Sequence, residues 1–336
     1  MRDLILKIKI LLFSLLMSGS TQAAVFFVAT DGNDSNTGSI DNPWKTIDKA
    51  NKTVKAGDTV FIRGGTYSGE QIYPMSNGTA TNRITYRNYG DEQVRITDVG
   101  TAILLNNRTY ITVSGSPNQN IIIENCDHGA TANYAHHIIL SYIDFGVMRN
   151  FTSSRGINIG AGSTFNWIHH CEVHEYGYYS SRQDYGDMLY IGSSPAEGNA
   201  CNLIENCHIY HGGHVPFKVN GRFIVVRNNY LHNEEWYPKE NPEYGNRNMS
   251  TLDYEDSTIE GWVLIEGNRF AFTGIPSDAV YSSGIQHCSH DCIIRKNMFF
   301  ACKGPGLKIE PIRRAPDADN NYVYPVSYTH LRAHET

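Results

Sequence analysis

Charged side chains and helical periodicity are both scarce in this sequence. Only 18% of its 336 residues are charged, with a formal net charge of −6 at pH 7, against about a quarter in an average soluble protein. This scarcity excludes a coiled coil, and the negative charge argues against nucleic-acid binding, which needs clusters of Lys and Arg. The 40% of hydrophobic residues supplies enough apolar surface for a core, so wholesale disorder is also excluded.

Long hydrophobic runs are missing as well, apart from a short one near the start. Basic residues precede the apolar stretch 10–17, and small residues at 21–23 offer a cleavage site. We therefore expect residues 1–23 to be a secretory signal peptide. The apolar stretch is much shorter than the roughly 20 residues of a membrane-spanning helix, so we expect no transmembrane segment. These features predict a secreted, periplasmic or cell-surface protein, and we expect it to be a monomer.

The last residues, 326–336, have a different character. They resemble a translated sequencing-library adapter, so His330 and His334 are not expected to form a metal site. The domain is then expected to occupy residues 24–325 and to be truncated at its C-terminus.

Cysteine is sparse, and its positions fit a repeat better than a disulfide framework. Seven Cys in a chain of this length do not make a disulfide-stabilised miniprotein. Short strand-like segments align so that one column of the repeat is formed by Asn and Cys, namely Cys126, Asn150, Cys171, Cys207, Asn229, Asn268 and Asn297. Successive members are mostly one coil of a parallel β-helix apart, and stacked Asn amides can bond to neighbours above and below.

Only one segment shows apolar residues at the spacing of an α-helix. Apolar residues recur through 43–54, with Asn42 placed as an N-cap and Pro43 in the first turn. This predicts a short helix ahead of the strands.

The opening of the chain carries a recognisable motif. The stretches Val25–Gly38, Asn42–Ile47, Ala56–Val60 and Arg63–Tyr67 resemble the start of secreted right-handed parallel β-helix proteins of the pectate-lyase-like superfamily. The resemblance implies an all-β fold, a right-handed parallel β-helix (solenoid) with a short N-terminal capping helix. The superfamily includes polysaccharide lyases, epimerases and glycoside hydrolases, so the resemblance implies a carbohydrate-active protein without choosing the reaction.

Apolar–polar–apolar triplets recur between the Asn and Cys positions. Successive strand residues face opposite sides, so the flanking residues are expected inside and the middle ones outside. The middle column of the alignment reads Asn158, Tyr190, Lys218, Asp253, Gln286 and Lys308. Two residues further along, the same outward face is expected to carry Asn220, Glu255 and Glu310.

Lyase chemistry on a uronic-acid polymer needs a base that removes the proton at C5. Lys218 is the first candidate, with His214 or Tyr190 next. The strand around Lys218 is similar to the Lys-bearing strand of the chondroitinase B and alginate lyase group. Those enzymes carry a catalytic Arg one coil later, where the alignment places Asp253 instead.

The same reaction needs a positive charge that offsets the substrate carboxylate. Asp253, Glu255 and Asp256 concentrate carboxylates suited to Ca²⁺, a hard ion that takes oxygen ligands. Arg222 or Arg247 would serve instead of the metal.

Further polar and aromatic residues of this face, and of the segment 234–248, are expected to bind an acidic polysaccharide. The predicted substrate-binding residues are Asn158, Asn220, Arg222, Trp236, Arg247 and Gln286.

Two alternatives to a lyase stay open. A glycoside hydrolase would use Asp253 and Glu255, which alternate onto one strand face roughly 6.6 Å apart. A non-catalytic glycan-binding or adhesive β-helix would use the same groove without chemistry. The His residues between 169 and 232 lack a zinc-binding pattern, and we interpret them as polar decoration.

Overall fold

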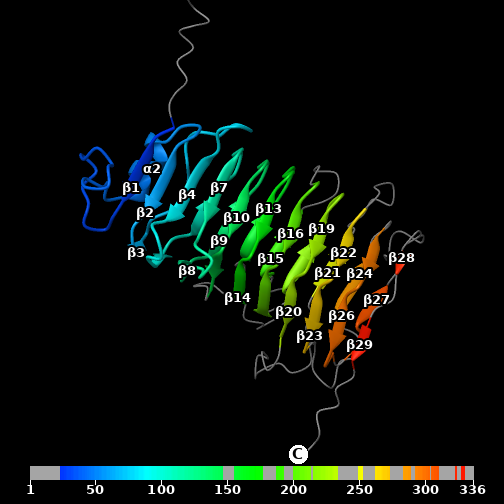
Figure 1. Ribbon diagram of the computed structural model, residues 1–336. Coiled ribbons are helices and arrows are strands. Elements are labelled where there is room, and N and C mark those ends of the chain that lie inside the picture. Colours follow the sequence, from blue (N-terminus) through cyan, green and yellow to red (C-terminus); the bar gives the residue numbers. More distant parts are fainter. Residues whose placement is uncertain are drawn as a thin grey trace, which may run out of the picture.

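The computed structural model shows a right-handed parallel β-helix whose coils stack along one axis (Figure 1). It describes residues 23–146, 155–176, 187–192, 200–212, 215–233, 249–252, 262–272, 283–288, 292–302, 304–309, 322–323 and 327–329. Each coil between residues 84 and 309 contributes one strand to each of three sheets, here named A, B and C. Every strand pair in these residues is parallel, so the predicted fold class is confirmed.

From β4 (Ile84–Asn88) onward the strands follow one another in strict rotation through sheets A, B and C, whereas β1 and β2 both belong to sheet A and β3 to sheet B. Sheet A contains β1 (Val25–Val28), β2 (Thr59–Ile62), β4 (Ile84–Asn88), β7 (Ile111–Ser114), β10 (Ile139–Ser141), β13 (Trp167–His169), β16 (Leu203–Glu205), β19 (Val225–Arg227), β22 (Leu264–Glu266), β25 (Ile293–Arg295) and β28 (Tyr322–Val323). Sheet B contains β3 (Gly65–Ser68), β5 (Val94–Thr97), β8 (Ile121–Glu124), β11 (Ile143–Phe145), β14 (Glu172–Tyr176), β17 (His208–Gly212), β20 (Tyr230–His232), β23 (Arg269–Ala271), β26 (Met298–Phe300) and β29 (Ser327–Thr329). Sheet C contains β6 (Thr101–Leu104), β9 (His128–Ala132), β12 (Arg155–Ile159), β15 (Leu189–Ile191), β18 (Phe217–Val219), β21 (Met249–Leu252), β24 (Ile285–Cys288) and β27 (Leu307–Ile309).

The predicted helix exists but begins later than expected. Helix α2 spans Ile47–Thr53, and its N-cap is Thr46, whose hydroxyl accepts a hydrogen bond from the Lys49 amide at 3.0 Å. Asn42 and Pro43 were therefore wrong as helix-start residues. Within the described part of the chain, no helix has the length and hydropathy needed to cross a membrane.

A residue just before the helix, Trp44, is extended and packs against the first strand instead. Trp44 forms a parallel bridge with Val28, and its ring stacks on Phe26 with centroids 4.5 Å apart. Only 2% of Trp44 is exposed, and its indole N–H donates to the Asn36 carbonyl at 3.0 Å. This packing covers the N-terminal end of the solenoid, and the extended backbone it requires explains the late helix start.

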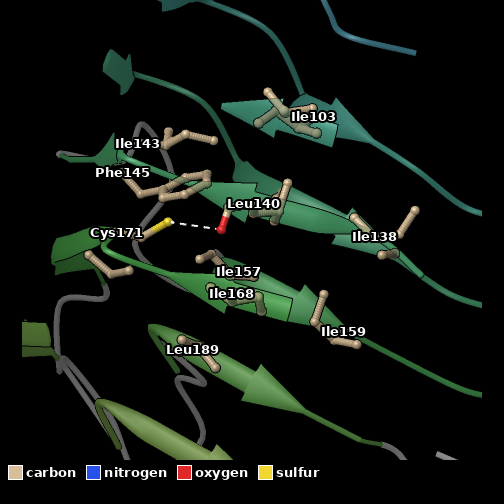
Figure 2. Close-up of a cluster of buried hydrophobic side chains, with 14 of the residues drawn as sticks. Ile103, Ile138, Leu140, Ile143, Phe145, Ile157, Ile159, Ile168, Cys171 and Leu189 are labelled. Carbon is tan, nitrogen blue, oxygen red and sulfur yellow. Dashed lines mark hydrogen bonds between the residues drawn. The ribbon is translucent and has the colours of Figure 1, made fainter. Parts of the chain in front are cut away.

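The core is a continuous apolar column inside the solenoid. Figure 2 shows side chains from all three sheets meeting there: Leu140 and Ile168 from sheet A, Ile143 and Phe145 from sheet B, and Ile157 from sheet C. All five are at most 1% exposed. Full burial of one such side chain contributes about 1.5–3 kcal/mol, so the alternating pattern fixes which face of each strand turns inward.

The predicted Asn and Cys column is confirmed from Cys171 onward and wrong at its start. Asp144 pairs with Glu172 across β11 and β14, so Ile143 is the residue beside Cys171. Cys126 is buried but follows β8 at a different corner, and Asn150 lies outside the described residues. The observed column is Ile121, Ile143, Cys171, Cys207, Asn229, Asn268 and Asn297.

Its amide members form a hydrogen-bonded ladder. The side-chain oxygen of Asn297 accepts from the backbone N–H and the side-chain amide of Asn268 at 2.9 and 3.0 Å. Asn268 makes the same two bonds with Asn229, at 2.9 and 3.0 Å. Asn229 in turn accepts from the Cys207 N–H at 2.9 Å. These buried polar groups are thus mutually satisfied, which offsets the free-energy cost of removing them from water.

A second amide ladder, which the repeat pattern did not predict, lies ahead of sheet A. The side-chain oxygen of Asn202 accepts from the N–H and the side-chain amide of Asn166 at 3.1 and 3.0 Å. Asn166 accepts from the Ile138 N–H at 2.9 Å. The corner that precedes sheet A is therefore also stabilised by stacked Asn side chains, in earlier coils.

The thiols behave as small core residues. Cys171 lies among the apolar side chains and points at the Leu140 carbonyl, 3.6 Å from its sulfur (Figure 2). Burial raises the pKa of the Cys171 thiol, and the neighbouring Cys207 raises it further. Within the described residues, Cys171, Cys201 and Cys207 carry free thiols.

Candidate functional site

The outward face of sheet C carries the column of polar residues that the sequence predicts. Asn158, Tyr190 and Lys218 are in direct register on β12, β15 and β18. Their neighbours along each strand are 0–1% exposed and point into the core. Because strand residues alternate, the three middle side chains stand on the outer side of the sheet.

Tyr190 lies between two cations. The Arg155 guanidinium carbon is 4.1 Å from the Tyr190 ring centroid, and the Lys218 ammonium nitrogen is 5.3 Å from it. Arg155 precedes Tyr190 by one coil and Lys218 follows it by one coil. Contacts of this kind contribute about 0.5–2 kcal/mol each, depending on how far the cation is desolvated. Lys218 is strongly shielded, with 6% of its surface exposed.

Arg155 is held by its own strand and by the coil before it. Its Nη1 donates to the side-chain oxygen of Asn158 at 3.2 Å, and its backbone N–H donates to Nδ1 of His128 at 3.2 Å. Burial lowers the pKa of His128, and the charge of Arg155 lowers it further. The imidazole therefore favours its neutral form, in which Nδ1 can accept the amide proton.

Sequence reasoning missed Arg155. In a regular strand every second residue faces the same side, so the outward residue before Asn158 was expected at Gly156. Strand β12 begins one residue earlier, at Arg155. The strand has two adjacent buried residues, Gly156 and Ile157, so Arg155 and Asn158 both face outward. The available signal was a charged residue directly before a glycine, two positions ahead of an apolar–polar–apolar triplet.

The next strand corrects the predicted register. Ser250, not Asp253, pairs with Lys218, because β21 (Met249–Leu252) begins with Met249 opposite Phe217. The alignment was wrong because Leu252-Asp253-Tyr254 fits the apolar–polar–apolar pattern better than Met249-Ser250-Thr251, which ends in a polar residue. Further along, the backbone positions of Gln286 and Lys308 are in register with Ser250, as expected for the column.

Two predicted substrate-binding residues lie around the corner from this face. Asn220 is 3% exposed, and a side chain at Gly192 would meet the Asn220 carbonyl at 1.9 Å, so Asn220 packs into the bend between coils. Arg222 forms an isolated bridge with Ala200 on the turn toward sheet A. The alternation that would have turned them outward ends where β18 ends, at Val219.

The remaining predicted residues lie outside the described part of the chain. These are the catalytic candidate His214, the substrate-binding candidates Trp236 and Arg247, and the metal ligands Asp253, Glu255 and Asp256. Among the residues that are described, no group of three or more His, Cys, Asp or Glu side chains could hold a metal ion.

Titratable and aromatic side chains also line the outside of sheet B. His174 Nε2 lies 2.9 Å from an Asp144 carboxylate oxygen, and the Tyr210 hydroxyl donates to Glu172 at 2.7 Å. Although burial opposes it, the hydrogen bond with Asp144 raises the pKa of His174. Nearby His208 approaches Glu172 with its Nδ1 at 3.6 Å.

The rings of this surface stack on one another along the axis. Tyr210 is nearly parallel to both His174 and His232, with centroids 5.0 Å apart in each case. His208 and His232 bring their Nε2 atoms to 2.7 Å, so one ring must donate and the other accept. Neighbouring rings therefore occupy the faces on which a sugar would stack.

Sheet C therefore offers the arrangement with the clearest chemical use. A lysine shielded from solvent could remove or donate a proton, and two cations beside an aromatic ring suit an anionic partner with an apolar face.

Comparison with known proteins supports the fold and identifies the family. The sequence profile of the family described as "Pel9A-like, right handed beta helix region" matches residues 26–249. Pectate lyase Pel9A has a similar structure, with a TM-score of 0.56 and 16% sequence identity over 90% of this chain and 80% of that protein. A rhamnogalacturonan lyase gives a TM-score of 0.55 and 15% identity over 83% of this chain and 74% of that one.

Curated relatives match shorter stretches. Uncharacterized protein YwoF from Bacillus subtilis is 31% identical over 116 residues, covering 32% of this chain and 25% of that protein. Pectate lyase PEL9 from Emericella nidulans is 39% identical over 75 residues, covering 22% of this chain and 18% of its own length. The chain thus spans a quarter or less of the curated relatives that it matches. The profile match covers most of the chain and agrees with the parallel sheets described above, so the chain belongs to the Pel9A-like right-handed β-helix family.

Proposed function

We propose that this protein is a polysaccharide lyase that cleaves uronic-acid-containing glycans by β-elimination, with Lys218 as the base. The amine of Lys218 takes the proton from C5 of the sugar. The electron pair left on C5 forms the C4–C5 double bond, and the bond from C4 to the glycosidic oxygen breaks. That oxygen leaves with the other half of the chain and takes a proton from solvent or a nearby side chain.

The observation that carries this proposal is the position of Lys218. It stands on the outward face of sheet C, is 6% exposed, and lies against the Tyr190 ring. An amine must lose its own proton before it can accept one, and burial disfavours the charged form. Tyr190 would hold the amine in place and present its ring edge to the sugar.

The comparisons support a lyase over the alternatives without deciding the substrate. The chain belongs to the Pel9A-like family, and a named pectate lyase is among the curated relatives. Likeness to solved structures at 15–16% identity supports the fold alone. The proposal therefore includes three parts: an acidic polysaccharide as the substrate, a location of the protein outside the cell, and cleavage by β-elimination.

We also propose a divalent cation, Ca²⁺, as the partner of the substrate carboxylate. The described residues do not provide a ligand cluster, so Asp253, Glu255 and Asp256 would have to supply it. When bound, the ion would neutralise the carboxylate and so make the C5 proton more acidic.

The test follows the ultraviolet absorbance of the unsaturated uronate product. The protein is incubated with polygalacturonate, alginate and glycosaminoglycans, with Ca²⁺ and with a chelator. We expect product with at least one polymer, and a loss of about 10²–10⁴-fold in rate for Lys218→Ala. Lys308→Ala is the matched control, because Lys308 lies in the same column three strands away and should leave the rate unchanged.

Other outcomes would replace the proposal. New reducing ends without ultraviolet absorbance would indicate a hydrolase, and binding without any cleavage would indicate a glycan-binding module. Full activity of Lys218→Ala would remove Lys218 from the mechanism. Activity that is unaffected by the chelator would remove the cation.

A further inference from the structure

We propose that Arg155 determines substrate specificity by binding the carboxylate of a second uronic acid while Lys218 acts on the first. The inference rests on the function proposed above and deepens it. It predicts a preference for polymers that carry free carboxylates on successive sugars, rather than for esterified or isolated uronic acids.

The first observation is that the charge of Arg155 is not neutralised by a carboxylate within the described residues. Within those residues, the Arg155 guanidinium contacts the Asn158 side-chain oxygen and the Tyr190 ring. Several other arginines pair with a glutamate on a neighbouring coil, namely Arg63 with Glu92, Arg95 with Glu124, Arg227 with Glu205 and Arg295 with Glu266. Within the described residues other arginines also have no carboxylate partner, but Arg155 shares the Tyr190 ring with a second cation, Lys218. Two cations brought together in a chain of net charge −6 favour an anionic ligand.

The second observation is that Arg155 is already oriented. Its guanidinium lies 4.1 Å from the Tyr190 centroid, and its Nη1 bonds to Asn158 at 3.2 Å. A planar guanidinium fixed in this way keeps its other N–H groups in one plane, where they can form a paired contact with a carboxylate. Holding the side chain in advance also reduces the entropy lost when a ligand binds.

The third observation is the spacing along the axis. Arg155 belongs to β12 and Lys218 to β18, with β15 between them. Parallel strands lie about 4.8 Å apart, so the backbones of the two residues are separated by about 9.6 Å along the solenoid. Their charged groups lean toward the shared Tyr190 ring, at 4.1 and 5.3 Å from its centroid, and so lie somewhat closer together than that. An extended sugar chain lying along this face would place different residues at the two cations. The geometry therefore fits a repeating polyanion better than a single acidic sugar.

A purely structural stack is the competing explanation, and the molecule contains a matched example. Arg269 lies over Tyr230 at 5.0 Å on sheet B, again from a neighbouring coil. If stacking is the whole role of Arg155, then substitution at either arginine would affect only stability.

The test measures equilibrium binding by affinity electrophoresis, independently of cleavage. Polygalacturonate and alginate are used, each as the free acid and as an ester. We expect Arg155→Gln to weaken binding of a free acid about tenfold or more, as expected for a lost charged hydrogen bond. Binding of the ester should be unchanged. Arg155→Lys keeps the charge without the planar fork and should give an intermediate loss.

Arg269→Gln is the matched control and should bind the free acid and the ester like the wild type. Thermal melting of each variant ensures that binding is compared at the same folded fraction. The inference is overturned if Arg155→Gln binds the free acid like the wild type, if Arg269→Gln weakens binding equally, or if the wild type binds neither form. If the wild type releases no unsaturated product but shows Arg155-dependent binding of the free acid, the lyase proposal fails and the carboxylate subsite stands.

Discussion

At the residue scale, the feature that distinguishes this solenoid is the buried amide. A buried Asn is tolerated only when both ends of its side chain are bonded, and a ladder achieves this because each coil supplies the partner of the next. Asn268 is the central member: it is 0% exposed, accepts two bonds from Asn229 and donates to the Val226 carbonyl at 3.0 Å.

Replacing Asn268 should therefore destabilise the fold strongly. Asn268→Ala leaves the N–H and the amide of Asn229 without their acceptor, at a cost of about 2–4 kcal/mol in the free energy of unfolding. Urea unfolding followed by circular dichroism measures it. Asn82→Ala makes the same chemical change at an exposed site and should cost no more than about 0.5 kcal/mol. Equal effects of the two variants would contradict the ladder's role.

At the scale of the element, sheets B and C place different chemistry on their outer faces. Sheet C alternates cations with an aromatic ring, whereas sheet B joins carboxylates to imidazoles and tyrosines. In sheet B the pKa of Glu172 falls from 4.5 to about 2, foremost through the His208 ring and then through the Tyr210 hydroxyl. The folded state therefore favours the ionised form of Glu172 more than the unfolded chain does.

This surface should make the protein sensitive to acid. Because the folded-state pKa of Glu172 is lowered, its contribution is complete above about pH 4.5 and is lost as the pH falls toward 2. Thermal melting between neutral pH and pH 3 should show that the wild type loses more stability than Glu172→Gln, by about 1–3 kcal/mol. Parallel curves for the two proteins would show that Glu172 has the same pKa in the unfolded chain.

At the scale of the whole molecule, stability is distributed along one axis. Each coil contacts mainly the coils beside it, so the ends need protection that the middle does not. The N-terminal end is covered by Trp44 and α2, and Trp44 is among the most buried aromatic residues there.

Removing that cover should loosen the first coils while leaving distant ones intact. Trp44→Ala creates a cavity worth about 3–5 kcal/mol. Hydrogen exchange should then speed up in β1 and β2 and stay unchanged in β16 and β19, because coupling passes only between neighbours. Trp167→Ala, at a residue that is 38% exposed, is the control and should leave the first coils protected. A uniform loss of protection would mean that the solenoid unfolds as a single unit.

Much of this architecture was predictable because it depends on local patterns that repeat. The triplets around Asn158, Tyr190 and Lys218 gave both the face and the register, since a one-residue shift would bury a charge. The register failed at Ser250, because the polar Thr251 makes the true triplet a poorer match to the pattern than the one around Asp253, and only pairing with the neighbouring coil decides between them. Arg155 was missed for a related reason, because its outward direction depends on two adjacent buried residues that break the alternation.

The regular stacking of coils also has an evolutionary consequence. Each coil places one residue in every column, so duplication of a segment that encodes a whole coil would lengthen the protein and leave its other faces in phase. A duplication between β12 and β18 would move Arg155 and Lys218 apart by one strand spacing, whereas one elsewhere would not change their separation. Descendants of such a gene could thus change in length and in the polymer repeat that they recognise as two separate traits.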